Sequence, residues 1–257
     1  MSENLPLHEF YRGRTLNFGH RGASHDAPAN TLAAFKLAAD YGADGVELDV
    51  ILTADKQPVV IHDYHVDATT DGTGKVADLT LAQIKELDAG GYFDPRFAGE
   101  RVPTLSEVFE AVGDRLLFNI ELKGITLWPD GMEAIVADLI RRHNMTSRVI
   151  VSSFNPLRLR RLRKIAPEIP IGFLHRPDLP IHQRWGWLMW GVPHEADHPM
   201  ESTVTPAYMA WARRHRYRVN TWVVNDPERM AALRDMGVDM IMTDRPDVLR
   251  AVLQGER

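Results

Sequence analysis

The stretch VELDVILTADKQPVVIHD, residues 46–63, decides the fold, because it contains two apolar runs joined by a short turn. The first run places Glu47 and Asp49 two residues apart on a predicted strand, where alternation puts both carboxylates on one face. If the two runs pair as an antiparallel hairpin, facing residue numbers sum to about 111, and His62 stands opposite Asp49. The stretch therefore predicts an imidazole beside two carboxylates.

The apolar runs of the whole chain give nine candidate strands, most of which alternate with predicted helices. The run Val59–Ile61 follows its predecessor after about four residues, too few for the crossover that parallel neighbours need. We therefore assign this run to a hairpin and keep the other candidates for the main sheet. They are Leu16–Gly19, Gly45–Val50, Leu116–Glu121, Val149–Ser152, Ile171–Leu174, Glu195–His198, Val219–Val223 and Met240–Met242.

Eight strands that alternate with helices predict an α/β fold, a (β/α)8 TIM barrel. The β-hairpin and a short turn-rich insertion at residues 64–102 would follow the second barrel strand, and we expect residues 1–257 to form a single domain. Asn30 is a predicted helix N-cap, and the segments Thr80–Gln83 and Thr104–Glu107 are predicted capping boxes.

Charged residues stand at or near the ends of the first three barrel strands. They are His20 on the first, Glu47 and Asp49 on the second, and Glu121 with Lys123 on the third. Because active sites of TIM barrels lie at the C-terminal ends of the strands, we expect these side chains to meet at one rim. A single E-x-D pair is more often a surface ion pair, but buried strands make unpaired carboxylates costly. The combination therefore predicts a catalytic site.

The chain has no cysteine, so a metal ion would have to be held by oxygen and imidazole ligands. The carboxylates of Glu47, Asp49 and Glu121 suit a hard divalent cation, Mg²⁺ or Ca²⁺. Phosphate is the natural substrate oxygen donor beside such a cation. We therefore expect a metal site that handles a phosphoryl group.

Four further residues complete the predicted chemistry. Arg21 and Lys123 would supply positive charge where negative charge develops in the transition state. His20 and His62 come from different strands and would form an acid and base pair, one activating the attacking oxygen and the other protonating the leaving group. The residues alone do not assign the two roles. His198, at the end of a weak predicted strand, is a further candidate.

Composition limits the partners. The formal charge is −5, from 30 basic and 35 acidic residues, which argues against a nucleic-acid binder. The sequence has neither a signal-peptide pattern nor an apolar run long enough to span a membrane, so a soluble cytoplasmic protein with a small-molecule substrate is expected. A homo-oligomer is compatible with this composition. The arginine-rich run Leu157–Lys164 is interpreted as a solvated helix face over a core face of Leu157, Leu162 and Ile165.

An ordered set of short motifs, from about residue 16 to 250, resembles the glycerophosphodiester phosphodiesterase family. The motifs are His20-Arg21-Gly22, Pro28, Asn30-Thr31, Glu47-Leu48-Asp49-Val50, His62-Asp63, Thr69 to Gly74, Glu121-Leu122-Lys123, Ser153-Phe154, Trp222 to Asn225 and Thr243 to Pro246. Their shared order makes the resemblance much more specific than any one motif.

The resemblance implies a TIM barrel that hydrolyses glycerophosphodiesters to sn-glycerol 3-phosphate and an alcohol. It implies that Glu47, Asp49 and Glu121 bind a divalent cation and that His20 and His62 are the general acid and base. It also implies that Arg21 and Lys123 contact the phosphate and that Trp222 lines a glycerol pocket. The chain departs from the family at Ala29, where a glutamate is usual. That change bears on site orientation or metal affinity more than on the reaction class.

Two alternatives stay open at this point. The aromatic stretch Trp185–Trp190 precedes the weakest strand, on a long connection near the barrel rim. An apolar rim there would favour a lysophospholipase D-like activity on lysophospholipids, although burial against the barrel is also compatible. The second alternative is a barrel weakened in catalysis, through changes such as Ala29, that only binds phosphodiesters.

Overall fold

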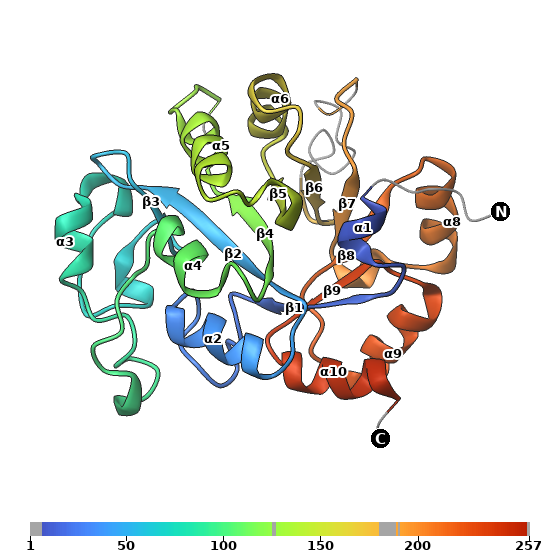
Figure 1. Cartoon of the computed structure of the whole chain (residues 1–257), viewed down its shortest axis with the longest axis horizontal. Helices are drawn as coiled ribbons and strands as arrows, with labels where there is room; N and C mark the ends of the chain where they lie inside the picture. The colour runs from blue at the N-terminus through green and yellow to red at the C-terminus, as the bar shows by residue number, and fades with distance from the viewer. Residues whose placement is uncertain (1–6, 125–126, 180–188, 190, 256–257) are drawn as a thin grey trace.

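The computed structural model describes residues 7–124, 127–179, 189 and 191–255 (Figure 1). Eight parallel strands form a closed ring, because β1 pairs with both β2 and β9. The predicted (β/α)8 barrel is confirmed. In ring order the strands are β1 (Leu16–His20), β2 (Gly45–Leu52), β4 (Leu117–Leu122), β5 (Val149–Ser153), β6 (Ile171–His175), β7 (Ala196–Pro199), β8 (Arg218–Thr221) and β9 (Met240–Thr243).

Helices surround the ring of strands (Figure 1). Neighbouring helices pack in pairs, α2 with α4, α5 with α6 and α9 with α10. None of the helices in the described part of the chain has the length and apolar character needed to cross a bilayer. The outer helices are α2 (Leu32–Asp40), α4 (Leu105–Val112), α5 (Met132–Arg142), α6 (Pro156–Ile165), α8 (Pro206–Arg214), α9 (Pro227–Met236) and α10 (Pro246–Gln254).

Local start signals confirm most predicted helix boundaries. Both capping boxes are formed: Thr80 caps α3 (Leu81–Lys85) and Thr104 caps α4. The prediction of Asn30 as an N-cap is wrong, because Thr31 caps α2 by accepting a hydrogen bond from Ala34 N. Asn30 instead has a φ of +60°, and its side-chain amide donates to Asp49 Oδ2.

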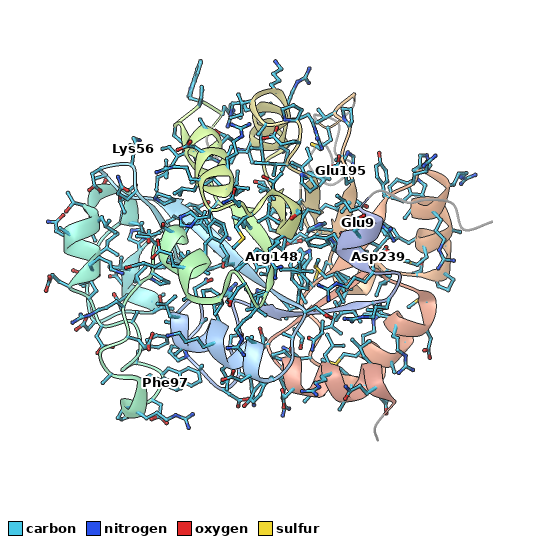
Figure 2. The ribbon with its side chains drawn as sticks, in the orientation of Figure 1. Glu9, Lys56, Phe97, Arg148, Glu195 and Asp239 are labelled. Carbon is cyan, nitrogen blue, oxygen red and sulfur yellow. The ribbon has the colours of Figure 1, made fainter. Side chains whose placement is uncertain are left out.

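The predicted hairpin is present, but its register differs by one residue from the prediction. β3 (Pro58–Val60) pairs antiparallel with the end of β2, Val50 facing Val60. Thr53 N donates to Gln57 O, so the turn centres on residue 55, and Lys56 takes a left-handed φ of +61° at its tip (Figure 2). Asp49 therefore faces Ile61, not His62, and Ile61 N donates to Asp49 O.

The segment 64–102 packs on the hairpin, outside the ring of strands. It contains α3 and three short 3₁₀ helices, η1 (Val66–Ala68), η2 (Val76–Asp78) and η3 (Pro95–Phe97). Val66, Val76 and Ile84 are buried together with Ile51 and Ile61 of the hairpin region in a separate apolar cluster. The segment 64–102 therefore packs against the part of the chain that leads to His62.

Phe10 and Tyr11 of α1 (His8–Tyr11) are buried against side chains of the barrel strands. Tyr11 is fully buried and donates through its hydroxyl to Asn220 Oδ1 of β8, at 3.1 Å. Asn220 Nδ2 lies 2.9 Å from Nε2 of His198, which is also fully buried. Burial lowers the pKa of His198 to about 3. His198 is therefore a neutral interior residue and not the rim residue that the sequence suggested.

Candidate functional site

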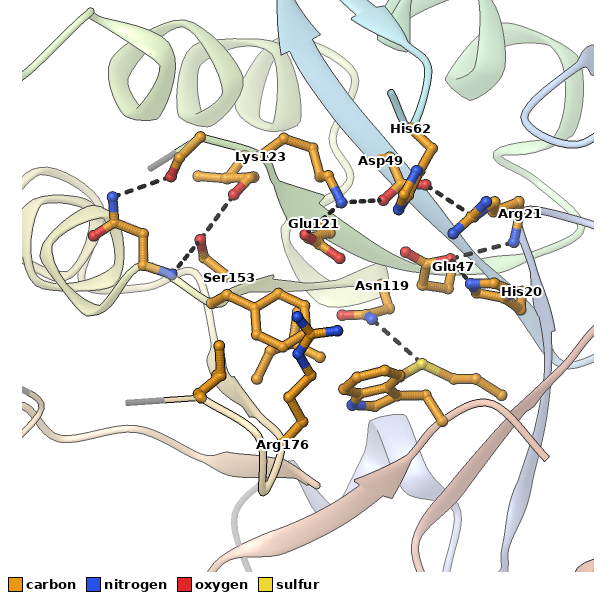
Figure 3. Close-up of a pocket in the computed structure, with 18 of the residues that line it drawn as sticks. His20, Arg21, Glu47, Asp49, His62, Asn119, Glu121, Lys123, Ser153 and Arg176 are labelled. Atoms are coloured by element: carbon orange, nitrogen blue, oxygen red, sulfur yellow. Dashed lines mark hydrogen bonds and ion pairs between the residues drawn. The ribbon is translucent and has the colours of Figure 1, made fainter. Parts of the chain in front are cut away.

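The residues that the sequence assigned to the metal, catalytic and substrate sites line one pocket of about 540 Å³, which the further candidate His198 does not line. Figure 3 shows these site residues, with labels on all but Trp222, around the carboxylates of Glu47, Asp49 and Glu121. The residues are His20, Arg21, Glu47, Asp49, His62, Glu121, Lys123 and Trp222. Segments far apart in the chain thus meet at the predicted rim.

Three buried carboxylates form the centre of this pocket. Glu47 and Asp49 alternate along β2, and Asp49 pairs in register with Glu121 of β4. One oxygen from each of the three lies within 4.8 Å of the others. Burial, with the charges of Asp49 and Glu121, raises the pKa of Glu47 well above its usual range. Burial also raises the pKa of Glu121 to about 7, opposed by Lys123. Burial and repulsion thus disfavour simultaneous ionisation of all three carboxylates, and the group presents three oxygen ligands at the spacing of a metal site.

Two basic side chains partly balance the carboxylates. Lys123 Nζ lies 3.0 Å from Glu121 Oε1 and 3.4 Å from Asp49 Oδ1. Arg21 Nε lies 3.3 Å from Asp49 Oδ2. Burial alone would raise the pKa of Asp49, but the charges of Lys123 and Arg21 lower it to about 2. Asp49 therefore stays ionised, and both cations point toward the carboxylate centre (Figure 3).

Backbone and amide contacts fix the carboxylates on β2. Arg21 has a φ of +56°, and its N–H donates to both Glu47 O, at 3.0 Å, and Glu47 Oε2, at 3.2 Å. Asn30 Nδ2 donates to Asp49 Oδ2 at 2.9 Å. The loop after β1 thus holds Glu47 and Asp49 from the neighbouring strand.

His20 ends β1 and is held by a carboxylate from the end of β9. Its Nδ1 lies 2.6 Å from Asp244 Oδ1, and its Nε2 lies 3.9 Å from Glu47 Oε2. Ser24 Oγ and Asn225 Nδ2 also donate to Asp244. Burial would raise the pKa of Asp244, but the bonds from His20 and these donors lower it to about 2. Asp244 is therefore an ionised partner that orients the imidazole.

His62 follows the hairpin and has a different partner. Its Nδ1 lies 2.8 Å from Oδ1 of the adjacent Asp63, whose side chain is largely exposed. Burial lowers the pKa of His62, and the opposing charge of Asp49 does not restore it. Despite the shifted register, Figure 3 places His62 beside Asp49. Both histidine side chains are partly buried, with 17% of His20 and 35% of His62 exposed.

Apolar and aromatic side chains form another part of the pocket lining. The Phe154 and Trp222 rings meet edge to face with centroids 5.4 Å apart. Trp222 Nε1 donates to His198 O at 2.9 Å, which fixes the indole. Leu157 and Leu174 extend this wall. The pocket therefore offers both charged and apolar lining residues to a ligand.

Sequence reasoning missed Asp244 as a partner of His20 and Asn30 as a partner of Asp49. The signal for Asp244 was its place just after the last strand, since β1 and β9 are neighbours in a closed barrel. Arg176, which follows β6 and lines the pocket, was also missed. No pattern in the sequence distinguishes Arg176 from the other arginines. The aromatic stretch Trp185–Trp190 lies outside the described residues, except for the buried Met189.

Comparison with known proteins agrees with this geometry. A 45% identical relative over 240 residues is a glycerophosphodiester phosphodiesterase of Caldanaerobacter subterraneus subsp. tengcongensis, and the match covers 92% of this chain and 96% of the relative. The crystal structure of a glycerophosphodiester phosphodiesterase from Agrobacterium tumefaciens matches with a TM-score of 0.79 and 33% identity, covering 92% of this chain and 99% of that one.

A structure with bound product is also similar. An Oleispira antarctica phosphodiesterase in complex with the product sn-glycerol-3-phosphate matches with a TM-score of 0.84 and 28% identity, covering 95% of this chain and 98% of that one. The sequence model of the glycerophosphoryl diester phosphodiesterase family matches residues 20–248. This chain therefore belongs to the glycerophosphoryl diester phosphodiesterase family.

Proposed function

We propose that the protein hydrolyses glycerophosphodiesters to sn-glycerol 3-phosphate and an alcohol, with a divalent cation and a pair of histidines. The observation that carries the proposal is the group of three buried carboxylates flanked by His20 and His62 in one pocket. The product complex of the Oleispira antarctica phosphodiesterase supports this substrate class. We further propose that residues 1–257 act as a single domain in the cytoplasm.

The carboxylates of Glu47, Asp49 and Glu121 fit a hard cation, Mg²⁺ or Ca²⁺. All the donors are oxygens, they converge within 4.8 Å, and their mutual repulsion needs positive charge. When bound, the cation would neutralise phosphoryl charge and polarise a phosphoryl oxygen.

Arg21 and Lys123 are proposed to contact the phosphate. Both already point toward the carboxylate centre, so they lose little freedom when an anionic group enters. Although burial disfavours its charge, the carboxylates of Asp49 and Glu121 raise the pKa of Lys123 above its usual value. Lys123 therefore stays charged at neutral pH and can stabilise charge on the phosphoryl oxygens.

His20 and His62 are proposed to move the protons. Each uses Nδ1 to contact a carboxylate, which leaves Nε2 for the reacting oxygens. One histidine takes a proton from the attacking oxygen, of water or of a substrate hydroxyl, while the other gives a proton to the leaving oxygen. Trp222 is proposed to line the glycerol subsite, because its ring lines the pocket and is fixed by its hydrogen bond to His198 O.

The test is the release of sn-glycerol 3-phosphate from glycerophosphocholine in the presence of Mg²⁺ or Ca²⁺, with a chelator as control. We expect chelator-sensitive release. If a well-folded preparation gives none from any diester tried, the enzyme is ruled out and a phosphodiester-binding barrel is favoured. Ala29 motivates that alternative, although it does not line the pocket formed by the described residues.

A second candidate substrate is a lysophospholipid. Two apolar side chains after β4 are strongly exposed, Leu127 at 69% and Trp128 at 80%, and Leu127 lines the pocket. Exposed apolar residues at a pocket mouth suit an acyl chain. Turnover of lysophosphatidylcholine that falls in Leu127→Ser, with glycerophosphocholine turnover unchanged, would support it. Negligible lysolipid turnover would exclude it.

A further inference from the structure

The connection from β4 to α5 carries Lys123 into the pocket, and α6 contacts it at several points. Lys123 N donates to Val50 O of β2 at 3.1 Å. Asn155 Nδ2, at the start of α6, donates to Gly124 O at 3.1 Å. Arg161 Nη1 donates to Leu127 O at 3.3 Å. Side chains of α6 and its N-cap therefore donate hydrogen bonds to backbone oxygens in the described parts of this connection.

Arg158 is the most buried of the α6 arginines, with only 1% of its surface exposed. It makes a two-pronged ion pair with Asp130, at 2.9 and 2.6 Å, and a third contact with Glu133 Oε1 at 3.1 Å. The predicted solvated arginine face is therefore wrong at this position. The predicted core residue Ile165 is exposed instead. Asp130 and Glu133 supply the charges that make burial of the guanidinium tolerable.

The same guanidinium packs against the residue next to Lys123. Gly124 has a φ of +124°, and a Cβ added there would overlap Arg158 Nη2. Only glycine allows both this backbone conformation and this close approach. Arg158 therefore touches both ends of the connection, Gly124 at its start and Asp130 at its end.

A buried ion pair is weak evidence for stability, because an apolar side chain of similar volume often serves as well. Its geometry, in contrast, is specific, since a guanidinium fork fixes both partners. We infer that Arg158 is a positioning residue: by holding Asp130 and Gly124 it sets the backbone from which Lys123 reaches Asp49 and Glu121. The consequence for catalysis rests on the proposed function.

The test uses Arg158→Lys, which keeps the charge and loses the fork, with Asp130→Asn as a second variant from the other side of the pair. Arg163→Lys is the matched control, because Arg163 lies on the same helix and pairs with Glu195 away from the pocket. We expect kcat/KM to fall about tenfold in both test variants and to stay unchanged in the control. In a Lys123→Met background, Arg158→Lys should cause less than about a twofold further loss.

A second measurement does not depend on hydrolysis. The rate at which an amine-specific reagent acylates Lys123, followed by mass spectrometry with Lys85 as internal reference, should rise several-fold in Arg158→Lys. An unchanged rate, or an additive loss in the Lys123→Met background, would overturn the positioning role. If the wild-type protein hydrolyses no diester while the labelling rate still rises, the proposed function fails and the positioning of Lys123 stands.

Discussion

Asp244 holds His20 from the other end of the chain: 224 positions separate the two residues, and Asp244 Oδ1 lies 2.6 Å from His20 Nδ1. The contact exists because β9 closes the barrel against β1, with Gly19 facing Thr243. A single imidazole orientation is thus set by closure of the whole ring.

Asp244→Asn should lower kcat at least tenfold and change KM little. The amide keeps the shape but cannot stabilise a positive charge on His20 or fix its tautomer as the carboxylate does. Steady-state kinetics on a glycerophosphodiester measure the effect. Asp63→Asn is the control, since that carboxylate is more exposed and should matter less. Equal kcat in Asp244→Asn and wild type would contradict the role of Asp244.

His20→Asn and His62→Asn should each lower kcat by about 10²- to 10⁴-fold, the range of general acid–base catalysis. The fold should survive, because both side chains are partly exposed at the pocket. Circular dichroism and thermal unfolding monitor the structure beside the kinetics. An unfolded variant would show that the histidine is a structural residue.

Glu47→Gln should reduce the stabilisation that a divalent cation gives. In the wild-type protein, three buried carboxylates repel one another, so a cation at about 100 times its Kd should raise Tm by roughly 5 to 10 °C. The variant removes one ligand charge, so a higher cation concentration should be needed. Differential scanning calorimetry with and without chelator tests this. An equal Tm shift in both proteins would mean that the cation binds elsewhere.

Stability should fall as the pH drops below 6.5, because of His198. Burial lowers its pKa in the folded protein to about 3, so the unfolded chain takes up a proton that the fold excludes. Between pH 6.5 and 4.5 this difference amounts to on the order of 2 kcal/mol. Urea unfolding of the wild type and of His198→Asn measures it, with the exposed His215→Asn as control. Parallel pH profiles for wild type and His198→Asn would refute the assignment.

Local sequence patterns were sufficient for most of the architecture. Helix starts such as Thr104 with Glu107 are defined by contacts within one turn, so they can be identified without tertiary information. The barrel followed from a length argument: the turn after β2 is too short for a parallel crossover, which removed β3 from the strand count. The carboxylates were found because alternation on β2 puts Glu47 and Asp49 on one face.

What the sequence could not supply depends on contacts between distant segments. The hairpin register is set by the hydrogen bond between Thr53 N and Gln57 O. The positions of the apolar runs do not define the register to within one residue. Asn30 is a good N-cap by type, but the nearby Asp49 carboxylate binds its amide instead. The local sequence around Arg158 predicts an exposed side chain. Its burial is explained by ion pairs with Asp130 on the preceding loop and Glu133 on the preceding helix.

The β3 hairpin stands outside the ring of strands, where β3 pairs with the last three residues of β2 and Val59 also bridges to Thr104. His62 is therefore carried by chain that takes no part in closing the barrel, whereas His20 and the carboxylates belong to the barrel wall. For protein engineering, the hairpin segment that carries His62 and the barrel wall that carries the carboxylates are two separate modules. Residues 53–102 could be exchanged between homologues, giving chimaeras in which one proton-transfer group and its surroundings are new while the carboxylate scaffold is inherited unchanged.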